Sequence, residues 1–211
     1  MDLSIAQLLH GAPVTSFLLL VNVAVGIYTL TVNPGLIDEW AFKPYQVVRN
    51  REWPRWLTAG FVHVGLMHLL FNMWTLYLFG PYVEMRMGSV SYAVMYFGAE
   101  LAANGLTYWK YRNAPAYSAV GASGAVSGVM FAFCLFEPFS VLYLIIPPIP
   151  VWAIIFAFFY VAISIYASNR GGGRIAHEAH LGGALGGIVL TILLYPAAVA
   201  TFVDQVAAKF G

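Results

Sequence analysis

Ser123 lies in a run of small residues that begins at Gly121 and continues as Ala, Ser and Gly124. These neighbours leave the serine hydroxyl accessible, and Gly121, Gly124 and Gly128 leave a surface that another backbone can approach closely. An accessible serine becomes a nucleophile when a base lies beside it. The alternative is a helix-packing face that happens to include a serine, because G-x-S-G is a weak motif and lacks the full G-x-S-x-G pattern of soluble hydrolases.

A candidate base, His180, stands near the start of the last apolar stretch. Gly183 and Gly187 follow it by three and seven positions, so the three residues share one helix face. This glycine-lined face can pack against the small face that carries Ser123, which would bring imidazole and hydroxyl together. The residues before it give H-E-x-H, which is one residue short of the metalloprotease motif H-E-x-x-H.

A third set of polar side chains lies in the apolar stretch that begins at Phe61. His68 and Asn72 are four residues apart and share a helix face, with Thr75 about one turn further on, whereas His63 is expected to point elsewhere. Three explanations are open for these side chains: hydrogen bonds between helices, a zinc site, or donors to a developing oxyanion.

Together the three sets predict acyl transfer, with a nucleophile, a base and oxyanion donors. No Asp or Glu is placed to orient His180, because Glu178 is two residues away and faces another direction. Glu100 lies inside another apolar stretch and needs a partner there. Asn104, one turn on, is the local candidate, and for Glu100 a structural role is favoured over a catalytic one.

The composition indicates a chain that is solvated mostly by lipid. Hydrophobic residues make up 61% of it and charged residues only 9%, against roughly 25% charged residues in average globular domains. The net charge of +1 and the lack of a basic run exclude a phosphate-tracking nucleic-acid binder. The lone Cys134 excludes an intramolecular disulfide and a cysteine-based zinc site.

Six apolar stretches are expected to cross the membrane, since a helix needs about 20 residues to do so. The first lacks a small-residue cleavage site and is expected to stay as a helix rather than to be removed as a signal peptide. The fourth is short. The stretches run approximately Val14–Thr31, Phe61–Tyr82, Val90–Trp109, Gly121–Phe136, Val151–Ser168 and Ala179–Val203.

The connectors divide into one long segment and several short ones. Residues 32–60 contain tryptophans together with Arg and Glu, a composition typical of the membrane–water interface. Asn169–Arg174 holds three consecutive glycines and is expected to be a flexible link. There is no repeat and no separate soluble portion, so residues 1–211 are expected to form a single all-α transmembrane domain.

With these motifs in order, the sequence resembles the rhomboid family of six-helix intramembrane serine proteases, from about Arg55 onward. Each motif is modest alone, but their order and spacing together are specific. The matching residues are His63, His68 and Asn72 (H-x-x-x-x-H-x-x-x-N), Gly121, Ser123 and Gly124 (G-x-S-G), Ala179, His180 and Gly183 (A-H-x-x-G, continued by Gly187), Gly80, Glu84 and Gly88 (G-x-x-x-E-x-x-x-G) with Arg86, and Arg55 and Thr58.

The resemblance implies a dyad of Ser123 and His180 with no catalytic acid. It implies an oxyanion site built from His68, Asn72 and the Ser123 backbone N–H, and it implies that Glu84 and Arg86 brace the long interfacial segment. The other matching residues, His63, Gly121, Gly124, Gly183 and Gly187, would give structural support. The substrates would be transmembrane proteins in the lipid bilayer, with no metal, cofactor or nucleic acid, and the location would be the bacterial inner membrane.

The sequence departs from the family pattern at two places. Many members have a tyrosine four residues after the nucleophile, where it stacks on the catalytic histidine, but this chain has Ser127 there. The family's Trp-Arg pair is also altered, because Pro54 precedes Arg55 and Trp56 follows it. Another group is therefore expected to hold His180.

Three questions stay open at this point. Counting Lys and Arg by the positive-inside rule puts the termini outside, whereas the resemblance implies termini in the cytoplasm. One rival function is a metal-dependent membrane hydrolase that uses four of the histidines. The other is a non-enzymatic transporter or a catalytically inactive rhomboid-like binder of membrane helices. The four histidines that the metal-dependent hydrolase would use are His63, His68, His177 and His180.

Overall fold

The chain folds into a helical bundle with one short hairpin. The structure is a computed structural model that describes residues 10–143, 149–170 and 176–211. The helices are α2 (Pro13–Thr31), α3 (Gly35–Trp40), α4 (Pro44–Arg49), α5 (Arg55–Thr58), η1 (Ala59–Phe61), α6 (Leu66–Met87), α7 (Ser89–Tyr111), α8 (Ser123–Phe136), α9 (Ala153–Arg170), α10 (His177–Leu194) and α11 (Ala197–Phe210), and the strands are β1 (Val141–Tyr143) and β2 (Pro150–Trp152).

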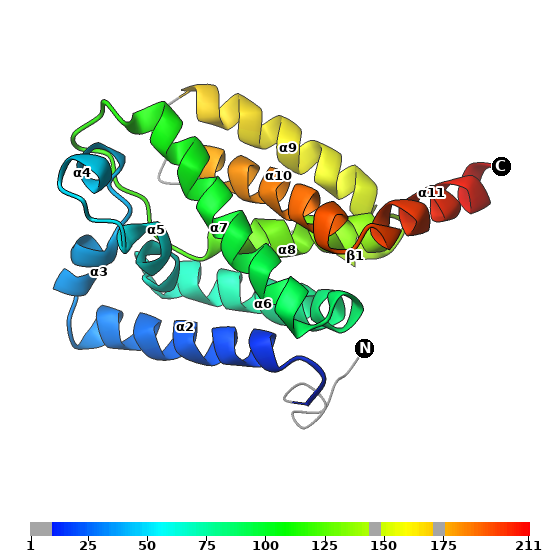
Figure 1. The fold of residues 1–211 in the computed structure, drawn as a ribbon, viewed down its shortest axis with the longest axis horizontal. Helices are drawn as coiled ribbons and strands as arrows, with labels where there is room; N and C mark the ends of the chain where they lie inside the picture. The colour runs from blue at the N-terminus through cyan, green and yellow to red at the C-terminus, as the bar shows by residue number, and fades with distance from the viewer. Residues whose placement is uncertain (1–9, 144–148, 171–175) are drawn as a thin grey trace.

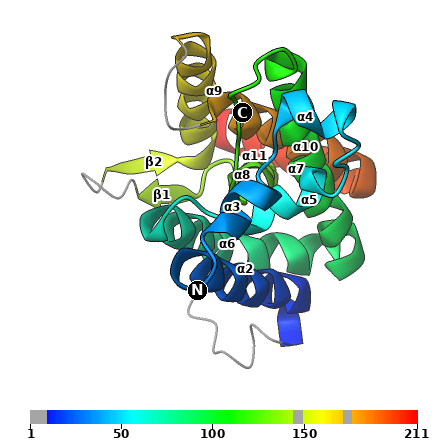
Figure 2. The ribbon, with the colours of Figure 1, turned by 90° about the vertical axis from the view of Figure 1, so that its left-hand side faces the viewer.

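From α2 to α10 the long helices alternate in direction along the bundle, so α2 begins at the end where α10 finishes, and α11 continues in the direction of α10 (Figure 1). The short helices α3, α4 and α5 gather at the opposite end, and Figure 2 looks onto that end with these helices in front. The first turns of α8 and α10 lie at this same end. Helices that cross a membrane one after another would alternate in direction in this way.

Two of the described helices, α2 and α10, are long and apolar enough to cross a membrane. A third span is counted if Arg55–Phe61 and Leu66–Met87, which meet at a bend of 96°, are taken as one broken crossing. The helix Ser123–Phe136 and the apolar part of α9, Ala153–Ser168, are shorter. The predicted count of six spans therefore stays a prediction.

Two predicted spans have other boundaries in the structure. The second does not begin at Phe61, because the chain leaves the helical conformation before α6 starts at Leu66. The last is not one helix, because it breaks between α10 and α11 at Tyr195 (φ −141°, ψ 73°). Pro196 follows directly, and a proline both lacks an N–H donor and disfavours the helical conformation of the residue before it.

The expectation of an all-helical chain needs a small correction. Residues 141–143 and 150–152 form an antiparallel pair in which Leu142 lies opposite Val151. The two strands are separated by residues outside the described part of the chain, and Pro147 and Pro148 lie there. The predicted flexible link likewise falls mostly outside it, since residues 171–175 are not described.

Helix α10 packs directly on α8 through glycines. A Cβ atom on Gly183 would lie 2.0 Å from the backbone oxygen of Gly124, and one on Gly187 would lie 2.3 Å from Cα of Gly128. Backbones can approach this closely only where side chains are absent, which is how helices associate in membranes that offer no hydrophobic driving force. The predicted contact between the two glycine faces is confirmed.

The predicted interfacial segment is folded against the bundle. Its Phe42 exchanges backbone hydrogen bonds with Ala119 (2.9 and 3.0 Å) and packs edge-on against Trp56. Arg55 donates to the carbonyl oxygens of Asp38 (3.0 Å) and Ala41 (2.9 Å). Arg55, the first residue of α5, thereby holds α5 against α3.

Glu84 and Arg86 do not brace this segment, so that expectation is wrong. The Glu84 carboxylate accepts hydrogen bonds from the amides of Val14 (2.9 Å) and Thr15 (2.7 Å), at the start of α2. Arg86 lies 3.7 Å from a carboxylate oxygen of Glu137. The interfacial segment precedes Leu66, the first residue of α6, whereas Glu84 lies near the other end of this helix, about 27 Å along its axis from Leu66.

Candidate active site

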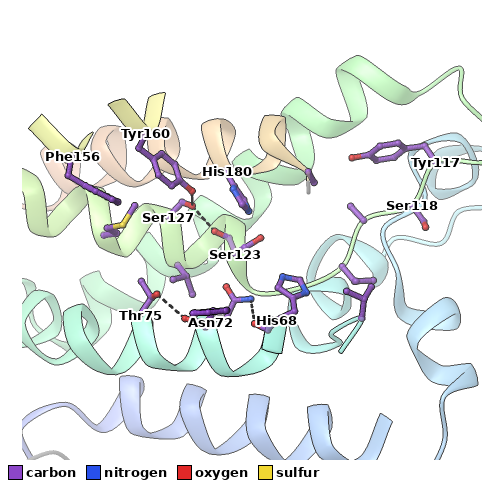
Figure 3. Close-up of a pocket in the computed structure, with 17 residues that line it drawn as sticks. His68, Asn72, Thr75, Tyr117, Ser118, Ser123, Ser127, Phe156, Tyr160 and His180 are labelled. Carbon is purple, nitrogen blue, oxygen red and sulfur yellow. Dashed lines mark hydrogen bonds between the residues drawn. The ribbon is translucent and has the colours of Figure 1, made fainter. Parts of the chain in front are cut away.

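A cavity of about 560 Å³ lies between α6, α8, α9 and α10. Figure 3 shows Ser123 in its middle, with His180 on one side and His68 and Asn72 on the other. These side chains come from three helices that are far apart in the sequence. The structure thus brings together all four residues that were predicted to do chemistry.

Ser123 is the first residue of α8, and its position leaves its amide free. Ala122 donates its N–H to Nε2 of His63 at 3.5 Å, and Ala125 donates to Oε2 of Glu100 at 3.2 Å. Within the described part of the chain, the Ser123 amide donates to no group. A free N–H at the positive end of a helix dipole is suited to an oxyanion.

His180 lies in the first turn of α10, and its side chain is half-buried. Its ring stacks on Tyr160 of α9, with centroids 6.1 Å apart and planes 24° from parallel. Among the described residues no hydrogen bond joins His180 to Ser123. Such bonds are often long or misaligned before substrate binds, so this geometry is compatible with a base and its nucleophile.

His68 and Asn72 face the cavity from α6. The Asn72 side chain donates one hydrogen to the His68 carbonyl at 2.9 Å, and its amide nitrogen carries a second hydrogen. Gly121 adopts φ +109°, and a Cβ atom there would lie 2.5 Å from Cε1 of His68. Glycine at this position therefore lets His68 reach the segment that leads into Ser123.

His63 does not point away from His68, so that expectation is wrong. The two rings meet edge to face with centroids 5.1 Å apart, and His63 is fully buried. The prediction assumed one continuous helix, but His63 precedes α6 and lies in a non-helical turn. From there its Nε2 reaches the Ala122 amide and supports the approach to Ser123.

Glu100 has a structural environment, as its sequence position suggested. Its carboxylate accepts hydrogen bonds from the Ala125 amide and from Asn104 (3.1 Å), and Asn104 also donates to the Trp56 carbonyl (2.9 Å). These contacts join α7, the first turn of α8 and α5. Glu100 therefore anchors the helix that begins with Ser123.

Glu178 is turned away from the base and belongs to another cluster. Tyr117 donates a hydrogen bond to its carboxylate, and Lys110 lies 3.9 Å from it. Burial first, and then the adjacent Glu178 carboxylate, raise the pKa of Tyr117, so its hydroxyl stays a donor. The cluster ties α7 and the loop before α8 to the first turn of α10.

Four of the five histidines fall into two pairs, His63 with His68 and His177 with His180. Over the described residues, no three side chains of the His, Cys, Asp or Glu type are arranged to hold a metal ion. In the part of the chain that the structure describes, these four histidines thus form paired rings.

One site residue, Tyr160, was missed in the sequence, whereas Ser127 was singled out there as a departure from the family pattern. Ser127 donates its single hydroxyl hydrogen to the Ser123 carbonyl at 2.7 Å, so the Tyr160 hydroxyl is the donor in its 2.7 Å hydrogen bond to Ser127. A hydroxyl inside an apolar span needs a partner, and that need was the available signal for Tyr160. Which helix would supply the partner could not be read from spacing.

Comparison with known proteins gives the family. The sequence model described as the rhomboid domain matches residues 50–197, more than half of the chain. YdcA, a rhomboid-family protein of Bacillus subtilis, is 35% identical over 146 residues, which cover 69% of each protein. The chain belongs to the rhomboid family, whose members are integral membrane proteins.

Two further relatives are longer than the region they share with this chain. The rhomboid protease GluP of Bacillus subtilis is 26% identical over 183 residues, which are 84% of this chain and 34% of GluP. The mitochondrial rhomboid protein 1 of Saccharomyces cerevisiae is 28% identical over 134 residues, which are 62% of this chain and 39% of that protein. The similarity thus covers most of this chain but well under half of each of these two relatives.

Proposed function

We propose that this chain is a serine endopeptidase that cleaves transmembrane segments inside the bilayer, with Ser123 as nucleophile and His180 as base. The observation that carries the proposal is the cavity lined by Ser123, His180, His68 and Asn72. Membership of the rhomboid family supports it. The proposal includes six membrane spans. It also includes a location in the bacterial cell membrane, for which the relatives in Bacillus subtilis are a support.

In the proposed mechanism a substrate helix unwinds locally, because an intact helix keeps its carbonyl groups in hydrogen bonds. Ser123 attacks the exposed carbonyl carbon while His180 takes the hydroxyl proton. His68, Asn72 and the Ser123 amide stabilise the oxyanion. His180 then gives the proton to the leaving amine, and water releases the acyl group from Ser123.

Fluorophosphonate labelling of the detergent-purified protein tests the dyad. We expect the wild-type protein to be labelled, Ser123→Ala to be unlabelled and His180→Ala to react at least about 100-fold more slowly, since a general base contributes 10²–10⁴-fold. Equal labelling of all three proteins would end the proposal. Loss of substrate cleavage with a chelator, restored by zinc, would instead support a metal-dependent hydrolase.

Asn72→Ala is predicted to lower the cleavage rate by about 10²–10³-fold, the cost of one oxyanion donor in soluble proteases. The variant should still bind substrate and react at Ser123, so KM should change much less than kcat. Initial rates at several substrate concentrations separate the two constants. A change confined to KM would assign Asn72 to substrate binding and remove it from the oxyanion site.

A further inference from the structure

The proposed base has no carboxylate to orient it. In soluble serine proteases a buried aspartate holds the catalytic imidazole in one tautomer and one direction. Here Glu178 is engaged by Tyr117 and Lys110, and Glu100 is engaged by Ala125 and Asn104. His180 must therefore be held by packing.

The ring of Tyr160 stacks on His180, whereas the ring of His177 meets it edge-on. The two planes are 24° from parallel, which fixes the tilt of the imidazole in a way that an aliphatic side chain would not. On its other sides the Tyr160 ring meets Phe131 (centroids 5.5 Å) and Phe156 (5.9 Å). The tyrosine is itself immobilised by aromatic neighbours from α8 and α9.

The hydroxyl of Tyr160 reaches the nucleophile through one side chain. It shares a hydrogen bond of 2.7 Å with Ser127, which in turn donates to the Ser123 carbonyl at 2.7 Å (Figure 3). One residue of α9 thus contacts the candidate base with its ring and reaches the backbone of the candidate nucleophile through Ser127. Ser127 lies one turn after Ser123, and its small side chain leaves room for the ring of Tyr160.

We propose that Tyr160 is a positioning residue that orients His180 toward Ser123, and that Ser127 links it to the nucleophile. This rests on the proposed Ser123–His180 dyad. The ring that the family pattern would place on α8, at position 127, is supplied here by α9. Because the support comes from a separate helix, the orientation of the base depends on how α9 sits against α8 and α10.

The test is the time course of fluorophosphonate labelling for the full chain in detergent. Tyr160→Leu keeps an apolar side chain but removes the flat ring, and we expect its labelling rate constant at saturating probe to fall about 10- to 100-fold, part of the 10²–10⁴-fold that a general base contributes. The final labelled fraction should stay at the wild-type value. Tyr160→Phe keeps the ring and should lose less than about fivefold, a hydrogen bond being worth about 1 kcal/mol.

Phe159→Ala is the matched control on the same helix, because its side chain is 56% exposed and lies outside the cavity lining. The double variant Tyr160→Leu with Ser127→Tyr supplies an aromatic ring from α8. Its labelling rate constant should recover at least about half of the loss seen in Tyr160→Leu, measured on a logarithmic scale. A merely structural role would lower the final labelled fraction at an unchanged rate constant, and it would not be rescued.

The proposed dyad and the proposed positioning role of Tyr160 would be overturned by different results. If the wild-type protein is not labelled, or labels without His180, the dyad itself is wrong. If labelling depends on His180 but Tyr160→Leu reacts at the wild-type rate, only the positioning role is overturned. A slow Tyr160→Leu protein with no recovery in the double variant also overturns it, provided that both melt at the wild-type temperature.

Discussion

Changing Ser123 to alanine is expected to lower the rate of substrate cleavage by about 10⁴-fold or more, and changing His180 to alanine is expected to cost about the same. In a soluble serine protease the loss of either residue costs nearly as much as the loss of the whole triad, because nucleophile and base act as one unit. A test substrate is a single-span segment with Gly and Pro near one interface, reconstituted with the enzyme in lipid vesicles.

The double variant sharpens this prediction. Ser123→Ala with His180→Ala should be no slower than either single variant, since the second change removes nothing that still works. Thr201→Ala removes a hydroxyl far from the cavity, where it donates to the Ala197 carbonyl, and should keep the wild-type rate. Multiplicative losses would mean that the two residues act independently, which the dyad does not allow.

The site was predictable to the extent that it depends on helix periodicity. His180, Gly183 and Gly187 share a face whatever the rest of the fold does, and so do His68 and Asn72. Glycine faces also limit which helices can meet, because only they allow backbone contact. Sequence spacing could therefore anticipate the packing of α10 on α8 and the nearness of Ser123 and His180.

The remainder depends on where separate elements end and how they lie beside each other. Tyr160 has no spacing relation to His180, since it comes from another helix and meets it only in the folded chain. Glu84 was assigned to the interfacial segment by the family resemblance alone, whereas its carboxylate binds the start of α2 in the folded chain. The break before Pro196 was also missed, although proline signals it locally.

Gly183→Ala is predicted to be strongly destabilising, although it adds a single methyl group. Its Cβ would lie 2.0 Å from the Gly124 oxygen and 2.6 Å from the Gly124 carbonyl carbon, and backbone atoms cannot rotate away as a side chain can. Overpacking of this kind costs about 1–3 kcal/mol or more. Thermal unfolding of the detergent-purified variant should show a lower melting temperature than that of the wild-type protein.

Gly105→Ala is the matched control, because it lies inside α7 and a Cβ there would meet no atom within 4 Å. Alanine is favoured over glycine inside a helix by about 0.5–1 kcal/mol, so this variant should melt at or above the wild-type temperature.

The two glycine variants are also expected to differ in activity, since Gly183 is one turn from His180. Pushing α10 away from α8 would separate His180 from Ser123, so Gly183→Ala should also label with fluorophosphonate more slowly than Gly105→Ala. Equal melting temperatures for the two variants would show that α10 does not depend on its glycine contact with α8.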